Sequence, residues 1–208
     1  MIKQGILIGT ILVTAIVILF VSITQSAQVR YSFNGNTSNS TREIVMKDGA
    51  IEYYFPYPGR ILPDHPLWSI KAARDQAWLF ITPKSERKAE LNLLFANKRL
   101  VSSKILFEKN KPELAYSTLV KAESYLQDSY SEEKIARENG VDTKSFLYNL
   151  SLASLKHREI INEMINIAPE DAGPQIVKME DVAKRIYNET AAVLTEIQMD
   201  VPESPFSD

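Results

Sequence analysis

The sequence predicts an all-α protein: an N-terminal transmembrane helix, then an up-and-down antiparallel bundle of four long helices and one short leading helix. Three observations support this prediction. An uncharged apolar run fills residues 6–23, apolar residues recur at helical spacing beyond residue 64, and only Gly140 and Gly173 follow Arg60 among the glycines. Scarce glycine with prolines at segment boundaries is typical of helices rather than of sheets that turn at glycines.

The composition limits the chemistry that the chain can perform. Its 208 residues suit one domain with appendages, and 24 basic against 26 acidic side chains give a net charge of −2. Without a basic surplus there is no general attraction for phosphate, so we expect no nucleic-acid partner. The absence of cysteine excludes disulfides and thiolate ligands, and two histidines, His65 and His157, exclude a histidine-rich metal site. We therefore expect no cofactor and no metal.

Residues 6–23 form an 18-residue run without a charged or amide side chain. Together with the preceding glycine it would span about 28 Å as a helix, close to the roughly 30 Å hydrocarbon core of a bilayer. We interpret it as a retained transmembrane helix, with residues 1–5 as a cytoplasmic leader and the bulk of the chain outside the cytoplasm. The alternative is a cleaved signal peptide, with small residues near Thr24 and Ser26 and a secreted product, but the run exceeds the usual apolar region of about 7–15 residues.

Two further features flank this span. Gly5 and Gly9 make a small-xxx-small pair that could support weak self-association, although chance is the simpler interpretation of so short a motif. Residues 24–53 are rich in Asn, Ser and Thr without helical periodicity, and this composition predicts a polar tether.

Prolines and glycines divide the remainder into five helical segments, because proline is tolerated in a first turn and glycine just past a helix end. The predicted helices are 64–81, 83–110, 112–139, 143–168 and 174–199. Asp64 is the expected N-cap of the first, and Asp142 or Thr143 that of the fourth. The bundle is thus assigned to residues 54–199, followed by an acidic tail over 200–208.

Apolar spacing predicts which helix faces are buried. The second predicted helix carries two apolar stripes, so it should lie centrally, whereas each later helix carries one. Its stripes are Leu91, Leu94, Phe95, Val101 and Ile105 on one side and Leu93, Ala96, Leu100 and Phe107 on the other. The single stripes are centred on Leu119, Leu150 and Ile186. In the leading helix, Leu67, Ile70, Ala73 and Ala77 are expected to form the packing side.

Residues 54–68 form a stiff entry motif of prolines and aromatic residues. It could be a recognition surface for a partner or a structural latch in which Phe55, Leu62, Leu67 and Trp68 close one end of the bundle, and we favour the latch. The residues singled out for either role are Tyr57, Pro58, Gly59, Leu62, Pro63, Asp64, Pro66, Leu67 and Trp68.

With the following Lys71-Ala-Ala-Arg-Asp75 and residues 88–100, the entry motif resembles an uncharacterised bacterial family, the domain of unknown function 5667. The resemblance covers residues 54–128. It implies a membrane-anchored or exported helical protein, and it brings with it no activity, cofactor or catalytic residue.

The remaining candidates for chemistry have structural interpretations. His157 could be a pH switch or a lone general base, but its place in an apolar stripe favours a hydrogen-bonded core histidine. His65 is expected in the turn before the first helix. The acid pairs Glu132-Glu133 and Glu170-Asp171 are interpreted as solvated or capping charges, and no catalytic motif is visible. We expect no enzyme.

These points predict a membrane-anchored, non-catalytic binding or scaffold module of the bacterial cell envelope, with the bilayer and an envelope protein as partners. The alternatives are an accessory sensor or regulatory subunit acting through another membrane protein and, third, an envelope hydrolase whose site no motif reveals.

Overall fold

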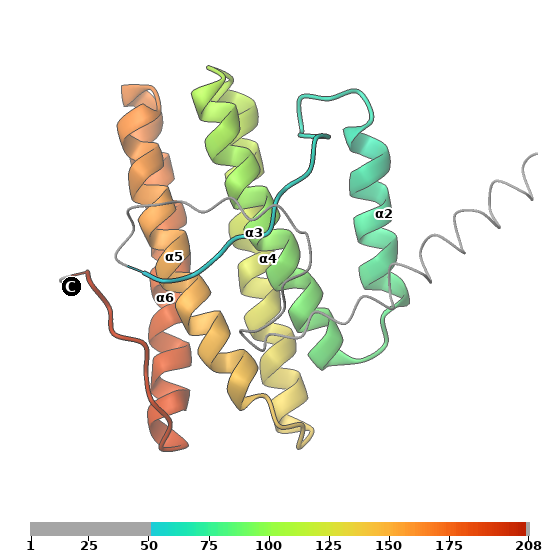
Figure 1. Cartoon of the computed structure of the whole chain (residues 1–208), viewed down its shortest axis with the longest axis vertical. Coiled ribbons are helices and arrows are strands. Elements are labelled where there is room, and N and C mark those ends of the chain that lie inside the picture. Colours follow the sequence, from blue (N-terminus) through green and yellow to red (C-terminus); the bar gives the residue numbers. More distant parts are fainter. Residues whose placement is uncertain (1–50, 207–208) are drawn as a thin grey trace, which may run out of the picture. The chain divides into compact units, whose positions relative to one another are not determined.

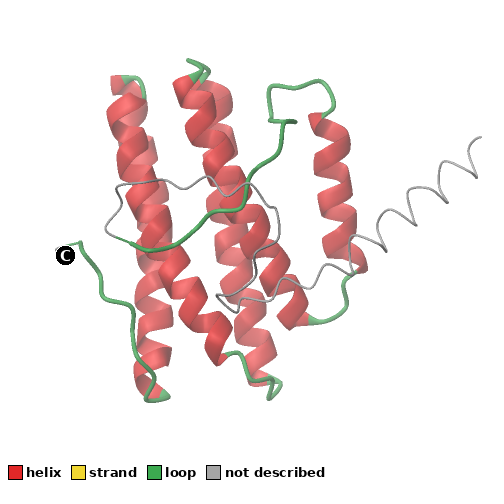
Figure 2. Cartoon of the chain, in the orientation of Figure 1, coloured by secondary structure: helices red, strands yellow, loops and turns green. Residues whose placement is uncertain are grey.

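The computed structural model describes residues 51–206, and this part of the chain is helical without strands (Figures 1 and 2). The helices are α2 (Trp68–Ile81), α3 (Ser85–Glu108), α4 (Pro112–Glu138), α5 (Lys144–Ile167), the 3-10 turn η1 (Glu170–Ala172) and α6 (Gly173–Glu196). The all-α bundle is therefore confirmed. The transmembrane helix predicted at residues 6–23 lies outside the described residues.

Most helix boundaries fall within a few residues of the prediction, and the reasons are the expected ones. Pro112 and Pro174 lie in the first turns of α4 and α6, where a missing N–H costs nothing. Gly140 follows α4 with φ of +81°, a left-handed conformation that glycine adopts without strain. Asn110 takes the corresponding position after α3 with φ of +57°.

The predicted start of the leading helix is wrong. Residues 64–67 form turns, and α2 begins at Trp68 with Leu67 as its N-cap position. The backbone N–H of Leu67 instead binds Nδ1 of His65 at 3.1 Å, as expected for a histidine in the turn before the helix. Asp64 is no cap, because its Oδ2 pairs with Lys111 at 2.8 Å and Lys109 at 3.4 Å.

Of the two residues predicted to cap α5, Asp142 binds the start of the helix and Thr143 does not. The Thr143 side chain caps no backbone group of the helix, because its hydroxyl donates to Oε1 of Glu133 at 2.6 Å. Asp142 accepts the N–H of Lys144 at 3.2 Å. Glu133, interpreted from the sequence as solvated, is buried, and it also accepts from Arg137 at 3.0 Å. This carboxylate joins the end of α4 to the start of α5.

The four long helices form a ring in the order α3, α4, α6, α5, in which each packs against two neighbours. Successive helices run antiparallel, as expected. In Figure 1, however, α3 and α5 rise while α4 and α6 descend, so the adjacent pairs α3/α5 and α4/α6 are parallel. Helix α4 therefore crosses to α5 on the diagonal of the ring, where the buried Glu133 joins them.

The core confirms the central place of α3. Residues from both of its predicted stripes are buried, and they divide between two apolar clusters stacked along the bundle. Leu93 and Phe95 lie in one cluster with Leu126, Leu150 and Ile186, whereas Leu100 and Phe107 lie in the other with Leu119, Ile160 and Met164.

Both ends of the described chain lie on the bundle as extended segments (Figure 2). The entry segment crosses the face formed by α5 and α3 (Figure 1), with Ile51 and Phe55 buried. Beyond α6, the hydroxyl of Tyr187 donates to the carbonyl of Pro202 at 2.8 Å, and Arg158 lies 4.3 Å from the centroid of the Phe206 ring. The tail as far as Phe206 is thus part of the packed structure.

Candidate functional site

The residues of the predicted entry motif differ widely in exposure. Pro58 and Leu62 are buried, Gly59, Pro63, Asp64 and Trp68 are half-buried, and Tyr57, Pro66 and Leu67 are exposed. Leu67, expected on the packing side, has 48% of its surface exposed. The motif therefore contributes Phe55 and Leu62 to the interior while it presents Tyr57 and Leu67 to solvent.

Lys71 of α2 holds the entry motif through its backbone. Its Nζ donates to the carbonyl oxygens of Pro58, at 2.6 Å, and Ile61, at 2.9 Å, and lies 5.1 Å from the centroid of the Trp68 ring. Gly59, with φ of +89°, shapes the loop between those carbonyls. Burial lowers the pKa of Lys71 to about 8, and the nearby Asp75 carboxylate opposes that shift.

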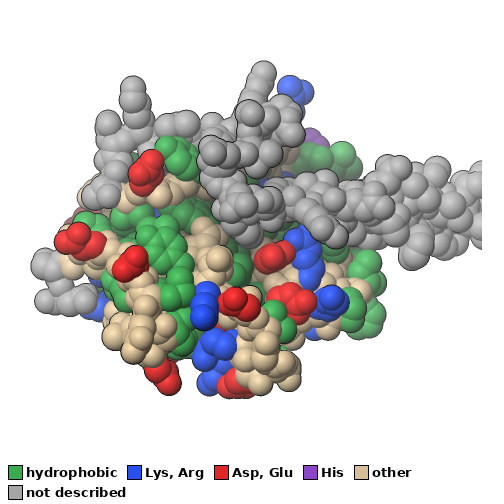
Figure 3. Space-filling view, turned by 60° about the horizontal axis from the view of Figure 1, so that its bottom comes forward, with side chains coloured by type: hydrophobic (Ala, Val, Ile, Leu, Met, Phe, Trp, Pro, Cys, Tyr) green, Lys and Arg blue, Asp and Glu red, His purple; other side chains and the backbone are tan. Residues whose placement is uncertain are grey.

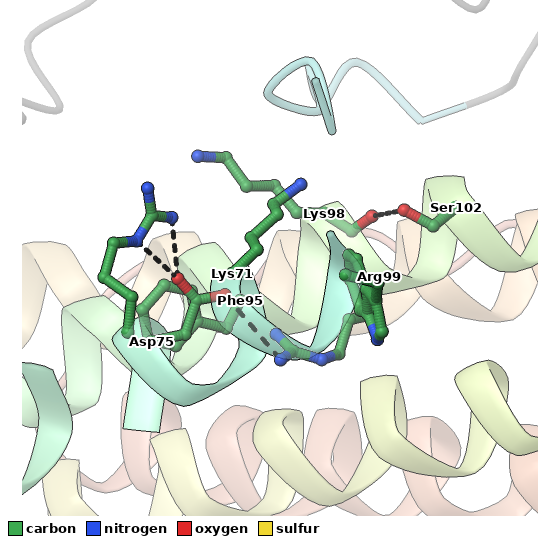
Figure 4. Close-up of a pocket in the computed structure, with 8 residues that line it drawn as sticks. Lys71, Asp75, Phe95, Lys98, Arg99 and Ser102 are labelled. Atoms are coloured by element: carbon green, nitrogen blue, oxygen red, sulfur yellow. Dashed lines mark hydrogen bonds and ion pairs between the residues drawn. The ribbon is translucent and has the colours of Figure 1, made fainter. Parts of the chain in front are cut away.

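Asp75 is the one α2 residue that is buried in the described structure. Its Oδ1 accepts from Arg74 at 2.8 Å, and its Oδ2 lies 3.7 Å from Nη2 of Arg99 on α3 (Figure 4). The Arg99 guanidinium also lies over two aromatic rings, 4.4 Å from the centroid of Tyr125 and 5.6 Å from that of Trp68. Charged groups therefore attach α2 to the bundle together with Trp78 and Leu79, which pack on the apolar core.

These side chains surround a small cavity between α2 and α3, whose lining is drawn in Figure 4. Its volume of about 20 Å³ admits a water molecule but no organic substrate. The ammonium of Lys98 lies near that of Lys71 in Figure 4, and burial lowers the pKa of Lys98 as well. A structural role in seating α2 and the entry loop fits this geometry better than catalysis does.

The outward face of α2 is apolar, which corrects the packing side expected from the sequence. Four of its apolar side chains are exposed: Phe80 (90%), Ile70 (64%), Ile81 (52%) and Leu67 (48%). Lys71 and Asp75 lie on the opposite, inward face together with Trp78 and Leu79, so α2 carries apolar side chains on both faces. Figure 3 shows hydrophobic side chains at the surface along its right-hand edge, the side on which Figure 1 places α2.

His157 belongs to a buried polar network that ties four segments together. Its Nδ1 lies 2.7 Å from Oε1 of Glu123 on α4, and its Nε2 lies 3.0 Å from Oδ1 of Asn97 on α3. Asn97 Nδ2 donates to the Tyr53 hydroxyl at 2.8 Å, and the Phe55 ring lies edge-on to His157 at 5.6 Å. Burial raises the pKa of Tyr53 to about 12.

The polar network around His157 is enclosed in the core. Both ring nitrogens of His157 are engaged, Nδ1 by Glu123 and Nε2 by Asn97. Both side chains are closed to solvent. The hydrogen-bonded core histidine is confirmed, and the network lacks the access that a general base requires.

A family model described as a domain of unknown function, number 5667, matches residues 60–204. The chain belongs to this family. The match extends the resemblance noted over residues 54–128 through the last helix and into the packed tail. No curated protein and no solved structure matches the chain.

Two features are absent from residues 51–206. No group of three or more His, Asp or Glu side chains in this range could hold a metal ion. No helix in the same range is long and apolar enough to cross a membrane.

Sequence reasoning missed the residues that attach α2. Lys71 and Asp75 stand one helical turn apart in the quoted stretch that follows the entry motif, and Arg99 lies in the second quoted stretch. Their spacing places the first two on one face of α2. Nothing in one sequence shows that this charged face turns inward, because the choice depends on Arg99 and on the backbone carbonyls that meet it.

Proposed function

We propose that the chain is a membrane-anchored, non-catalytic binding module of the bacterial cell envelope, and that the outward face of α2 is its contact surface. Residues 6–23 would hold it at the membrane, and the bundle would present α2. The observation that carries this proposal is the exposure of Phe80, Ile70 and Ile81 on a helix whose opposite face is held by ion pairs and by packing on the core.

Exposed apolar side chains gathered on one face are unusual unless a ligand or partner covers them. Lys71 and Asp75, together with the packing of Trp78 on Phe95, fix α2 with these exposed side chains outward. These contacts therefore support a surface kept open for binding.

The absence of a reaction is supported by how the titratable groups are used. His157 and Glu123 are enclosed in the core, and the Lys71 ammonium donates hydrogen bonds to two backbone carbonyls. The cavity beside Lys71 is the size of a water molecule. An enzyme would need a group able to reach a substrate.

Photo-crosslinking from α2 tests this proposal. A photoreactive amino acid at Phe80 in the full chain, irradiated in its native membranes, should give covalent adducts with whatever covers the face. The same amino acid at Asn188, exposed on α6, should give none. Equal labelling at both positions, or none at Phe80, would refute α2 as the contact surface.

Alkaline carbonate extraction tests the anchor separately. A helix at residues 6–23 should keep the chain in the membrane pellet. Release into the supernatant, or a mature N-terminus near Ser26 or Ala27, would contradict the membrane anchor. The role of α2 as a contact surface would still be tested separately by crosslinking from Phe80.

A further inference from the structure

We propose that the outward face of α2 lies on the surface of the bilayer, with its apolar side chains in the interface and its exposed cations at anionic headgroups. This inference rests on the proposed function, since it names the partner of the same surface. The partner of the α2 surface is then lipid rather than a second protein.

The form of the surface favours lipid. Ile70, Phe80 and Ile81 are exposed on one helix at the edge of the bundle (Figure 1), and Phe80 borders an open hollow lined also by Gln76, Lys88 and Asp128. An amphipathic helix with aromatic and aliphatic side chains on one face lies readily in the interface, because lipid chains adapt to an uneven surface. A protein partner would need a surface of matching shape.

The charges of α2 are complementary to an anionic surface. Arg74 lies beside the apolar face with 47% of its side chain exposed, whereas the single acid of α2, Asp75, has 4% exposed and faces Arg99. Lys84, three residues beyond the helix, has 75% of its side chain exposed, although Glu86 lies 3.8 Å from it. Exposed cations next to an interfacial helix are attracted to anionic lipid.

The number of residues between the predicted anchor and the described bundle suits such a contact. A flexible chain as long as residues 24–50 has a root-mean-square span of about 30 Å and a fully extended reach of about 90 Å. A face held that close to the bilayer has a high effective concentration of lipid around it. The four exposed apolar side chains would then be sufficient for binding to the bilayer, even if the bundle without its anchor bound lipid weakly.

The absence of native cysteine allows a direct test with single thiols. The full chain carrying Phe80→Cys or Asn188→Cys would be labelled with one environment-sensitive fluorophore and reconstituted in vesicles of anionic and neutral phospholipid. Some of the lipids would carry a nitroxide quencher at the headgroup. Both positions are exposed, so a melting curve should show that neither label disturbs the bundle.

We expect headgroup quenching of the residue 80 label to exceed that of the residue 188 label by about threefold or more, because only α2 would enter the interface. Adding Arg74→Glu should lower the residue 80 quenching in anionic vesicles and leave it unchanged in neutral ones. Adding Ile70→Glu should lower it in both, since a charge would then lie on the inserted face.

Equal quenching at the two positions would overturn the lipid assignment. So would a crosslink from Phe80 to a second copy of the chain or to another protein in native membranes. A crosslink to either kind of protein would leave the proposed contact surface standing and exclude the bilayer as its partner. The absence of any adduct at Phe80 would contradict both the contact surface and the lipid assignment.

Discussion

Oδ2 of Asp75 lies 3.7 Å from Nη2 of Arg99, and this ion pair joins the buried residue of α2 to the central helix of the bundle. The arginine is almost fully buried and rests on aromatic rings, so the carboxylate balances a charge that is largely shielded from water. Such a contact seats α2 in one rotation about its own axis. It explains how a helix can remain attached with its apolar face outward.

Asp75→Ala should release α2 from the bundle. We expect a loss of about 2–3 kcal/mol in the free energy of that attachment, because Arg99 loses its partner while its aromatic contacts remain. Amide exchange should accelerate across residues 68–81 and stay slow in α3 to α6. Arg74→Ala is the matched control, since Arg74 binds the same carboxylate from an exposed position and should cost less than about 1 kcal/mol. Similar amide exchange over residues 68–81 in the two variants would show that Asp75 does not hold α2 on the bundle.

Glu123→Ala should destabilise the whole bundle by about 3–5 kcal/mol, because it leaves the buried His157 without the oxygen that faces Nδ1. Urea unfolding measures this loss, and a double-mutant cycle with His157→Ala measures the coupling between the two side chains. Additive effects of the two substitutions would show that the pair does not act as a unit.

The predicted burial of the stripes can be tested with charges. Leu93→Asp and Leu119→Asp should each cost about 4 kcal/mol or more, since both leucines are enclosed by apolar side chains. Lys121→Ala, on the exposed back of α4, should change stability by less than about 0.5 kcal/mol. Comparable losses in all three would mean that the assigned faces are wrong.

The sequence predicts the long helices well because local rules and burial agree there. Pro112, Gly140 and Pro174 mark helix ends, and Leu93, Leu119 and Ile186 lie on stripes that the core then uses. Periodicity gives the buried face directly when a helix is surrounded by neighbours. That condition holds for α3 to α6.

The prediction fails where long-range polar contacts outweigh local pattern. Ile70 and Ala77 share a stripe with Leu67, but α2 turns it outward because Lys71 binds the entry loop, Asp75 pairs with Arg99 and Trp78 packs on the core. Residues that meet only in the folded chain leave no spacing signal in the sequence.

Lys71 makes the attachment of the entry loop depend on pH. Its pKa is about 8 in the folded chain against an ordinary value of 10.5, so between these values the unfolded chain binds more protons at this side chain. Its contribution to the free energy of unfolding therefore becomes more favourable as the pH rises from 8 to 10.5. Urea titrations should show the stability of the wild type rising relative to that of Lys71→Met over this range. Ile70→Met, which changes no titratable group, should keep a constant difference from the wild type.

Trp68 decides whether the entry motif acts as a latch. Its ring lies against the cations of Lys71 and Arg99. If the motif is a latch, Trp68→Ala should lower the free energy of unfolding by about 2 kcal/mol. That is less than the roughly 3–5 kcal/mol typical of a fully buried aromatic residue, because Trp68 is half-buried. Tyr57→Ala, at an exposed position of the same motif, should change stability by less than about 0.5 kcal/mol.

These two variants separate the latch from a recognition surface. In a latch, Trp68→Ala should lower the melting temperature and accelerate amide exchange over residues 68–81, because the loop at Pro58 loses the ring that covers Lys71. In a recognition surface, Trp68→Ala and Tyr57→Ala should both leave the melting curve unchanged and weaken a crosslink made by the wild type. The Trp68 ring lies over the Lys71 ammonium that binds Pro58 and Ile61, which favours the latch. Two unchanged melting curves would rule it out.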